Sequence, residues 1–293
     1  MPPLIRLARP HQYVKNGFVL VGPIFAFDWS TALLVKIVFA FAAFCAMASA
    51  VYVANDIVDV EADRAHPTKR NRPIASGQVS APTAWRFAAA LAIVALALAA
   101  LVSAHALEIL VVYALVQWGY SISWKHVVVL DVFLISLGFM LRIFMGTLGL
   151  GIRTSPWLVL CGLMVTLFLG FAKRRSELML IEKAGGSEAV STRKVLDDYS
   201  GVMIEQYMSI SAACTVITYS IYTVAPDTVA LHHTSYLIAT VPFVIYGIFR
   251  YLYLLHGAQF GGDAARELFE DRHLLVTTLA WLGTVAFVLA WRP

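Results

Sequence analysis

The fold of this chain is decided by an apolar run at residues 31–57, TALLVKIVFAFAAFCAMASAVYVANDI. About 20 apolar residues are enough to cross a lipid bilayer as one helix, and this run exceeds that length. Its end is polar and continues as Asn55-Asp56-Ile57-Val58-Asp59-Val60-Glu61-Ala62-Asp63. If the helix continues through this end, Asn55, Asp59 and Asp63 recur at every fourth position. They then line one face, with Asp56 beside them.

Carboxylates on one helix face repel one another unless a cation lies between them. Oxygen ligands of this kind suit Mg²⁺, which takes one or two carboxylates and completes its shell with water and substrate phosphates. A basic run follows, Arg64-Ala65-His66-Pro67-Thr68-Lys69-Arg70-Asn71-Arg72-Pro73, and its cations can hold phosphate oxygens. A solvated acidic helix end followed by a positive-inside loop explains either run alone as well as a functional site does. Together, at the end of a membrane helix, they favour a functional site.

The composition places most of the chain in lipid. Of the 293 residues, 60% are hydrophobic and only 14% are charged, and the mean hydropathy is +0.75. A soluble domain cannot cover so much apolar surface. The formal net charge of +4 is modest, and the Lys and Arg residues gather in particular loops. This pattern indicates membrane topology and phosphate sites, and no nucleic-acid partner.

We expect an all-α, polytopic membrane protein with a single domain over residues 1–293. About nine segments are apolar and long enough to span the bilayer: residues 14–27, 31–57, 82–104, 107–122, 127–150, 156–180, 202–224, 235–255 and 274–291. We expect no cleavable signal peptide, because Met1-Pro2-Pro3-Leu4-Ile5-Arg6 lacks an apolar core with a cleavage site. Cys45, Cys161 and Cys214 lie in apolar runs without disulfide or zinc spacing, so buried hydrophobic roles are expected.

Positive charge marks alternate loops. Lys and Arg residues follow the second, fourth and sixth segments, whereas the intervening loops carry few. The positive-inside rule therefore puts the N-terminus and the motif-bearing loops at the cytoplasmic face of the plasma membrane, and the C-terminus outside. Every candidate chemical group then lies at one face, where a soluble substrate can meet a lipid substrate.

The polar motif resembles the first aspartate-rich motif of the UbiA-type intramembrane prenyltransferase superfamily, whose nine-span layout the chain also resembles. The continuation His66-Pro67-Thr68-Lys69-Arg70-Asn71-Arg72-Pro73-Ile74-Ala75-Ser76-Gly77 is similar to the branch of decaprenyl-phosphate phosphoribosyltransferases. Further similarities to this branch are Arg9-Pro10 with Lys15-Asn16, Gly138-Phe139-x-Leu141-Arg142, Lys173-Arg174-Arg175-x-Glu177-Leu178 and Glu267-Leu268-Phe269-x-Asp271-Arg272. The resemblance covers nearly the whole chain and implies a UbiA-like helical bundle.

One departure from the superfamily supports this branch. Members that transfer prenyl groups usually carry a second Asp-rich motif near the sixth span, where this chain reads Lys173-Arg174-Arg175-Ser176-Glu177. One carboxylate cluster with one basic cluster suits a metal-bound diphosphate and a second anion. Phosphoribosyl pyrophosphate and a polyprenyl phosphate present these groups. Asp197-Asp198-Tyr199 stays open as a displaced second motif, although its spacing differs.

The resemblance and the charge placement imply a Mg²⁺-dependent glycosyltransferase that moves 5-phosphoribose from phosphoribosyl pyrophosphate to polyprenyl (decaprenyl) phosphate. The expected metal ligands are Asn55, Asp56, Asp59 and Asp63, and the three aspartates are the expected catalytic residues. The expected substrate-binding residues are Lys15, Asn55, Lys69, Arg70, Arg72, Tyr120, Lys125, Arg142, Lys173, Arg174, Arg175 and Glu177. The family further implies that the product is a donor for cell-wall arabinan.

Within this set, Lys69, Arg70 and Arg72 are expected to hold the donor phosphates, with Arg suited to bidentate contacts. The run Lys173-Arg174-Arg175, with Lys125, is expected to hold the lipid phosphate. That phosphate is anionic at neutral pH, so the reaction needs positioning and electrostatic stabilisation but no general base.

Several of these residues also have structural explanations. Arg142 and Asp131 lie in or beside the fifth segment, where charges face a cavity or a partner, so they pair with each other, with other spans or with a ligand. Tyr120 and the neighbouring Trp124 fit an aromatic belt at the membrane interface. Glu177 is expected to orient the basic run by pairing with Arg174 or Arg175.

Two rival functions remain open. The first is an aromatic prenyltransferase of the same superfamily with a polyprenyl diphosphate donor, against which the missing second Asp motif counts. The second is a transporter or channel, whose polar groups would be spread along a path instead of gathered at one face. Small residues at 88–90 and 146–151 allow helices to pack within or between chains, so a homo-oligomer stays open.

Overall fold

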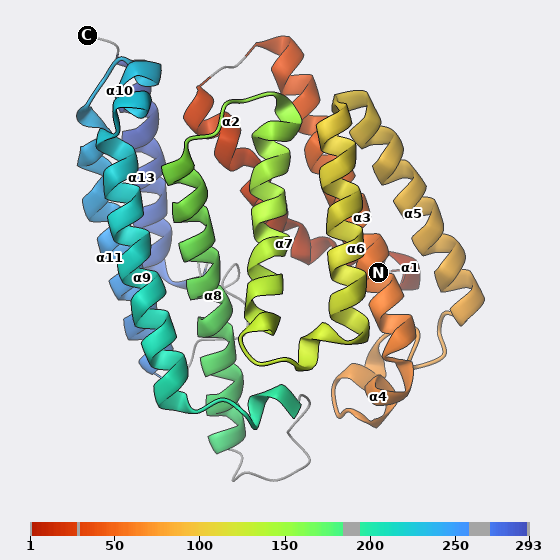
Figure 1. Cartoon of the computed structure of the whole chain (residues 1–293). Helices are drawn as coiled ribbons and strands as arrows, with labels where there is room; N and C mark the ends of the chain where they lie inside the picture. The colour runs from red at the N-terminus through yellow and green to blue at the C-terminus, as the bar shows by residue number, and fades with distance from the viewer. Residues whose placement is uncertain (1, 28–29, 184–193, 258–269, 292–293) are drawn as a thin grey trace. The chain divides into compact units, whose positions relative to one another are not determined.

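The computed structural model describes residues 2–27, 30–183, 194–257 and 270–291. Every regular element in these ranges is a helix (Figure 1). The α-helices are α1 (Pro3–Ala8), α2 (Val21–Ala26), α3 (Thr31–Val58), α4 (Val60–Ala65), α5 (Ala81–Val102), α6 (Ala104–Ile122), α7 (Leu130–Gly146), α8 (Pro156–Lys183), α9 (Gly201–Val224), α10 (Pro226–His232), α11 (Val241–His256) and α13 (Arg272–Ala290). The 3-10 helices are η1 (Pro10–Leu20), η2 (Lys69–Asn71), η3 (Trp124–His126), η4 (Leu148–Leu150), η5 (Lys194–Leu196) and η6 (Tyr236–Thr240).

The all-helical, multi-pass class predicted from the sequence is confirmed. Among the described residues, seven helices are long and apolar enough to cross a membrane, or up to eight if the bent pair α9 and α10 is one span. The predicted count of about nine is not reached there. The predicted first span, residues 14–27, is divided between η1 and α2, and η1 is a 3-10 helix of 11 residues. Such runs rarely exceed three or four residues, so this segment is not one straight α-helix.

The chain divides into two compact units: residues 1–125 with 141–153, and residues 126–140 with 154–293. In the first unit, α3 packs mainly against α5, and also against η1, α6 and α1. In the second unit, α8 packs mainly against α9, and α11 packs against α13. The acidic motif belongs to the first unit, and the basic run at 173–175 belongs to the second.

Small side chains are common among the residues that α3 and α5 bury, and Val53 of α3 packs in one cluster with Ala84 and Ala88 of α5. On α5 the alanines at 84, 88, 95 and 99 are buried, and their helical spacing puts them on one face. On α3 the buried alanines include those at 40, 43, 48 and 50. In lipid there is no hydrophobic drive between helices, so close backbone packing through small residues replaces it. This contact fixes the end of α3 on which the acidic motif lies.

Two glycines bring the N-terminal segment directly against the end of α7. A Cβ atom at Gly22 would lie 2.1 Å from the carbonyl oxygen of Gly146. A Cβ atom at Gly146 would lie 1.8 Å from the carbonyl oxygen of Val19. Since both obstacles are backbone atoms, neither can rotate away, and this close approach requires glycine at both positions.

We therefore expect Gly22→Ala to destabilise the protein by about 1–3 kcal/mol, the usual cost of overpacking. Thermal unfolding of the purified protein in detergent measures the effect. Gly17→Ala is the matched control, because a Cβ atom there would have no other atom within 4 Å. Equal unfolding temperatures for the two variants would show that the close approach does not constrain the fold.

Candidate active site

The acidic motif does not continue as one helix. α3 ends at Val58 and α4 begins at Val60, and Asp59 between them has φ −90° and ψ 10°. Backbone hydrogen bonds still run from the Asp59 N–H to the Asn55 carbonyl at 2.9 Å and from the Asp63 N–H to the Asp59 carbonyl at 2.8 Å, so the helical spacing of these three residues continues across the break, and their shared face stays a prediction. Asp56 and Asp63 meet one set of partners, and Asp59 meets another.

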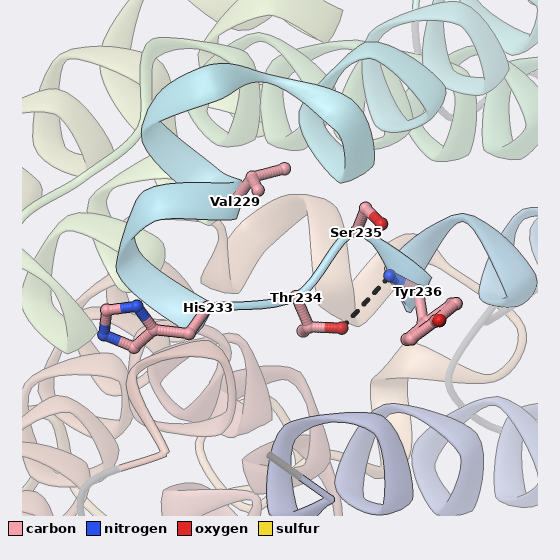
Figure 2. A pocket seen from close by; sticks show the side chains of 5 residues that line it. All are labelled: Val229, His233, Thr234, Ser235 and Tyr236. Atoms are coloured by element: carbon pink, nitrogen blue, oxygen red, sulfur yellow. Dashed lines mark hydrogen bonds between the residues drawn. The ribbon is translucent and has the colours of Figure 1, made fainter. Parts of the chain in front are cut away.

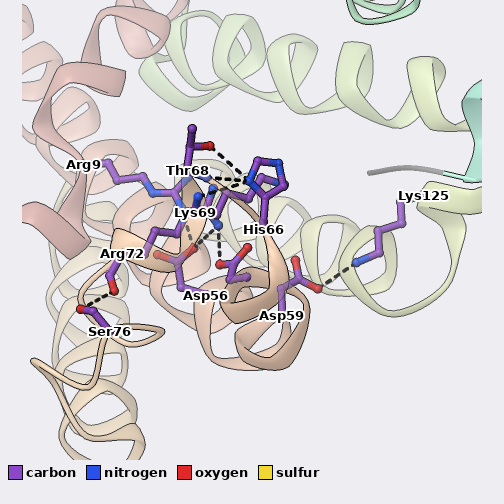
Figure 3. Close-up of polar contacts among 10 residues, drawn as sticks. Arg9, Asp56, Asp59, His66, Thr68, Lys69, Arg72, Ser76 and Lys125 are labelled. Carbon is purple, nitrogen blue, oxygen red and sulfur yellow. Dashed lines mark hydrogen bonds and ion pairs between the residues drawn. The ribbon is translucent and has the colours of Figure 1, made fainter. Parts of the chain in front are cut away.

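Asp56 and Asp63 share one arginine, Arg72, which Figure 3 shows beside Asp56. The Nη1 atom of Arg72 donates to Asp56 Oδ1 at 3.0 Å and to Asp63 Oδ2 at 2.7 Å. Arg9 donates through Nη2 to the same Asp56 oxygen at 2.5 Å. The Asp56 and Asp63 side chains are only 2% and 4% exposed, whereas those of Arg9 and Arg72 are 22% and 30% exposed. Two partly exposed guanidinium groups thus neutralise two buried carboxylates, which would be costly to bury alone.

Arg9 reaches Asp56 from an unusual backbone conformation. It ends α1 with φ 51° and ψ 57°, the left-handed region that glycine or asparagine usually occupies at a helix end. Its guanidinium group also lies 5.1 Å from the centre of the Tyr52 ring. Arg9 was part of the quoted resemblance but had no predicted role. Because the partner in α3 is far away in sequence, no local pattern could reveal the contact.

Asn55 has a partner at the end of α6, and Asp59 has one in η3. The Ser121 hydroxyl donates to Asn55 Oδ1, and Lys125 Nζ donates to Asp59 Oδ1 at 3.1 Å. Lys125 was predicted to hold a lipid phosphate, and the structure places it on a carboxylate of the motif. Tyr120, in the same stretch, is half-buried. The end of α6 is thus tied to the acidic motif.

His66 organises the basic loop that follows α4. Its Nδ1 atom accepts from the backbone N–H of Thr68 at 3.1 Å and of Lys69 at 3.3 Å (Figure 3). Partial removal from water lowers the pKa of His66, and the positive charge of Lys69 lowers this pKa further. Arg70 is exposed. His66 therefore lies in the loop, and its unprotonated ring nitrogen holds the turn before η2.

Two further predicted residues lie elsewhere in the first unit. Arg142 is buried and donates through Nε to Asn16 Oδ1 at 2.8 Å. Its guanidinium group lies 4.8 Å from the centre of the Phe44 ring and 5.0 Å from that of Tyr113. Lys15 is half-buried on η1. Arg142 therefore connects α7 to η1 inside the unit.

In the second unit, the predicted basic run has carboxylate partners. Arg174 is completely buried and donates through Nε to Asp131 Oδ2 at 2.6 Å, and through Nη1 to Glu177. The expected pairing of Glu177 is confirmed, and the partner of Asp131 is Arg174. Arg175 donates to Glu205 at 2.9 Å and to Glu182 at 3.4 Å. Lys173 is half-buried.

Tyr199 completes the buried Arg174 cluster. Its hydroxyl donates to Asp131 Oδ1 at 2.8 Å and accepts from the backbone N–H of Val129 at 2.7 Å. Val129 has φ 67°, which is strained for a β-branched residue. Burial and the hydrogen bond to Asp131 raise the pKa of Tyr199, so the hydroxyl keeps its proton. The segment before α9 is thereby fastened to the start of α7.

Two other features of the second unit contain no predicted site residue. A pocket beside α10 and η6 is lined by Val229, His233, Thr234, Ser235 and Tyr236 (Figure 2). Asp271 caps α13 by accepting from the Leu274 N–H at 2.8 Å and pairs with Arg250 at 2.7 Å. The rest of the quoted stretch Glu267-Leu268-Phe269 lies outside the described residues.

Residues 17–275 match the UbiA prenyltransferase family. This chain belongs to that family. The decaprenyl-phosphate phosphoribosyltransferase of Mycolicibacterium smegmatis is 34% identical over 295 residues, which cover 96% of this chain and 91% of that protein. The enzyme of the same name from Corynebacterium glutamicum is 35% identical over 301 residues, covering 99% and 87%. A UbiA homologue from Archaeoglobus fulgidus, solved with GPP and Mg²⁺, is 16% identical with a TM-score of 0.73, covering 98% of this chain and 99% of that one.

The acidic motif of this UbiA family member fits a hard divalent cation. Asp56 and Asp63 each direct one oxygen to the same Arg72 nitrogen, so two carboxylates converge on a point where a cation is already held. Mg²⁺ commonly takes one or two carboxylates and keeps water or phosphate in its other positions. In the described part of the chain, no group of three or more His, Cys, Asp or Glu side chains is arranged to hold a metal. The set of four ligands predicted from the sequence, Asn55, Asp56, Asp59 and Asp63, stays a prediction.

The lowered pKa of His66 makes the basic loop sensitive to acid. A pKa that folding lowers stabilises the folded state above the unfolded value of about 6.5, and this stabilisation is lost as pH falls through the folded value. We expect the unfolding temperature to fall more for the wild type than for His66→Ala between about pH 7.5 and pH 5. The exposed His11 provides the control variant His11→Ala. Identical pH profiles for wild type and His66→Ala would contradict this role.

Tyr199→Phe removes both hydrogen bonds of the hydroxyl and leaves an Asp131 oxygen without its donor. We expect a loss of about 1–3 kcal/mol of stability, measured by thermal or denaturant unfolding in detergent. Tyr207→Phe is the matched control: its ring packs 5.1 Å from that of Phe171, and its hydroxyl bonds to no other described residue. A loss no larger than that of the control would argue against the Tyr199 contacts.

Proposed function

We propose that this protein transfers 5-phosphoribose from phosphoribosyl pyrophosphate to a polyprenyl phosphate and releases pyrophosphate. The observation that carries the proposal is similarity of at least 34% over nearly the whole chain to two enzymes named decaprenyl-phosphate phosphoribosyltransferase. The protein is a multi-pass membrane protein, and the positive-inside rule assigns its N-terminus and its site to the cytoplasmic face of the plasma membrane. The chain acts as one integral membrane domain.

The first unit provides the donor site. Asp56 and Asp63 would hold Mg²⁺, with Asp59 and Asn55 beside them, and the ion would supply positive charge that neutralises the departing pyrophosphate. Arg72, Lys69 and the exposed Arg70 bind the donor phosphates. The support for this assignment is the convergence of two buried carboxylates on one cationic nitrogen, next to a loop of positive charge.

The acceptor phosphate is assigned to Lys173 and Arg175 of the second unit, whereas Lys125, which pairs with Asp59, is assigned to the site of the first unit. Arg174 is excluded from direct contact, because it is completely buried between Asp131 and Glu177. It acts as a positioning residue for its neighbours on α8. Lys15, Tyr120 and Arg142 are assigned to the substrate side of the first unit.

The transfer needs no protein base. A phosphate oxygen of the lipid attacks the anomeric carbon of the ribose, and the bond from this carbon to pyrophosphate breaks. Pyrophosphate leaves with the bonding electron pair. Since the attacking oxygen is already anionic, the protein contributes orientation of two anions and stabilisation of the charge on the leaving group.

The test incubates the purified protein with labelled phosphoribosyl pyrophosphate, decaprenyl phosphate and Mg²⁺, and follows label in the lipid fraction. We expect Asp63→Asn to lower turnover by about 100-fold, equivalent to roughly 2.7 kcal/mol of transition-state stabilisation. Glu61→Gln is the matched control in the same motif, because Glu61 is 80% exposed and pairs only locally with Arg64.

A second arm offers a polyprenyl diphosphate with an aromatic acceptor. Label transfer from phosphoribosyl pyrophosphate to lipid, lost in Asp63→Asn, supports the proposal. Prenylation of the aromatic acceptor without labelling of the lipid would refute it and would favour the prenyltransferase alternative. Near-normal turnover of Asp63→Asn would remove Asp63 from the metal site.

A further inference from the structure

The charges around Asp56 are balanced within the protein. Two buried carboxylates, Asp56 and Asp63, face two guanidinium groups, Arg9 and Arg72. Both arginines donate to one oxygen, Asp56 Oδ1. A metal ion that takes this oxygen must displace at least one of them, since the three cations would compete for the same lone pairs.

We propose that Arg9 and Arg72 are exchangeable counter-ions of this acidic pair. While the two arginines are paired with Asp56 and Asp63, they prevent a free divalent cation from binding these carboxylates. When the cation binds as a complex with a diphosphate, the arginines pair with the diphosphate instead. Metal and diphosphate binding are then interdependent, each strengthening the other. This inference rests on the proposed function only in requiring that the site takes a metal-bound diphosphate.

Charge explains the exchange. A free divalent cation would add its charge to two guanidinium groups that remain nearby, and their repulsion in a poorly solvated site opposes binding. A diphosphate brings negative charge for the displaced guanidinium groups, and Arg–phosphate contacts are strong and directional. The cation and both arginines then all have anionic partners.

The geometry allows the two side chains to move while their backbones stay fixed. The Arg72 carbonyl oxygen accepts from the Ser76 N–H at 2.9 Å and from its hydroxyl at 2.8 Å, which anchors the main chain. The Arg9 backbone is held in a strained conformation that persists only when the surroundings fix it. Both guanidinium groups are partly exposed, so a diphosphate can reach them from solvent.

The test measures two affinities in Arg9→Gln, which removes one counter-ion and keeps a polar side chain. Binding of Mn²⁺ alone is followed by electron paramagnetic resonance, and binding of inorganic pyrophosphate at saturating Mg²⁺ by calorimetry. We expect Mn²⁺ alone to bind about 10-fold more tightly than in the wild type, and pyrophosphate about 10-fold more weakly. A tighter affinity for Mn²⁺ alone together with a weaker affinity for pyrophosphate, in one variant, is the result that only exchange of the arginine predicts.

Two variants control for charge and for position. Arg9→Lys keeps the charge and should restore weak binding of Mn²⁺ alone. Arg6→Gln removes an exposed arginine of α1 that donates to Gln78 and to the Asn71 carbonyl, and should leave both affinities unchanged. Unfolding temperatures of all variants are recorded beside the affinities.

Other results overturn the inference. If Arg9→Gln weakens both ligands together, Arg9 is a structural ion pair, and if only pyrophosphate weakens, Arg9 is a simple phosphate ligand. If Arg9→Gln does not fold, Mn²⁺ binding to the wild type is the test. Micromolar binding of Mn²⁺ alone would show that the arginines do not block Asp56 and Asp63. Binding of Mn²⁺ only in the presence of pyrophosphate supports the inference. Because the probe is inorganic pyrophosphate, opposite shifts without ribosyl transfer would reject the proposed function and leave the exchange standing.

Discussion

The first unit depends on the neutralisation of one buried carboxylate, that of Asp56. A carboxylate that is 2% exposed is costly to bury unless it is paired and hydrogen-bonded. Its two partners come from different segments: Arg9 closes α1, and Arg72 follows η2. One charge therefore ties the N-terminal segment, the end of α3 and the basic loop together. These are the segments that carry the candidate donor site.

The second unit also contains a buried charge that is neutralised by ion pairs, but there the buried charge is positive. There the completely buried group is the cation, Arg174, and Asp131 and Glu177 neutralise it. Tyr199 adds a neutral hydrogen bond that holds the strained backbone at Val129. Buried charged pairs near the ends of membrane helices thus hold both units together internally.

Most of the helical framework could be predicted, because lipid requires about 20 apolar residues for each crossing and few sequences meet that requirement by chance. The exception was residues 14–27, where composition is apolar but the backbone is a 3-10 helix followed by the short α2. Its close approach to Gly146 is a tertiary contact that hydropathy does not encode. The roles of Arg174 and Arg175 escaped prediction for a similar reason: a basic run shows charge but not the partner of each cation.

The sequence alone determined that this is a multi-pass helical protein of the UbiA family, that its acidic motif lies at the end of α3, and that a basic loop follows. These features are local, since apolar length and motif spacing lie within single segments. Only the tertiary structure decided that the helix breaks at Asp59, that Arg9 and Arg72 meet Asp56, and that Lys125 meets Asp59. Buried charges pair when the packed fold brings their segments within hydrogen-bond distance. The spacing of residues in the sequence does not show which segments these are.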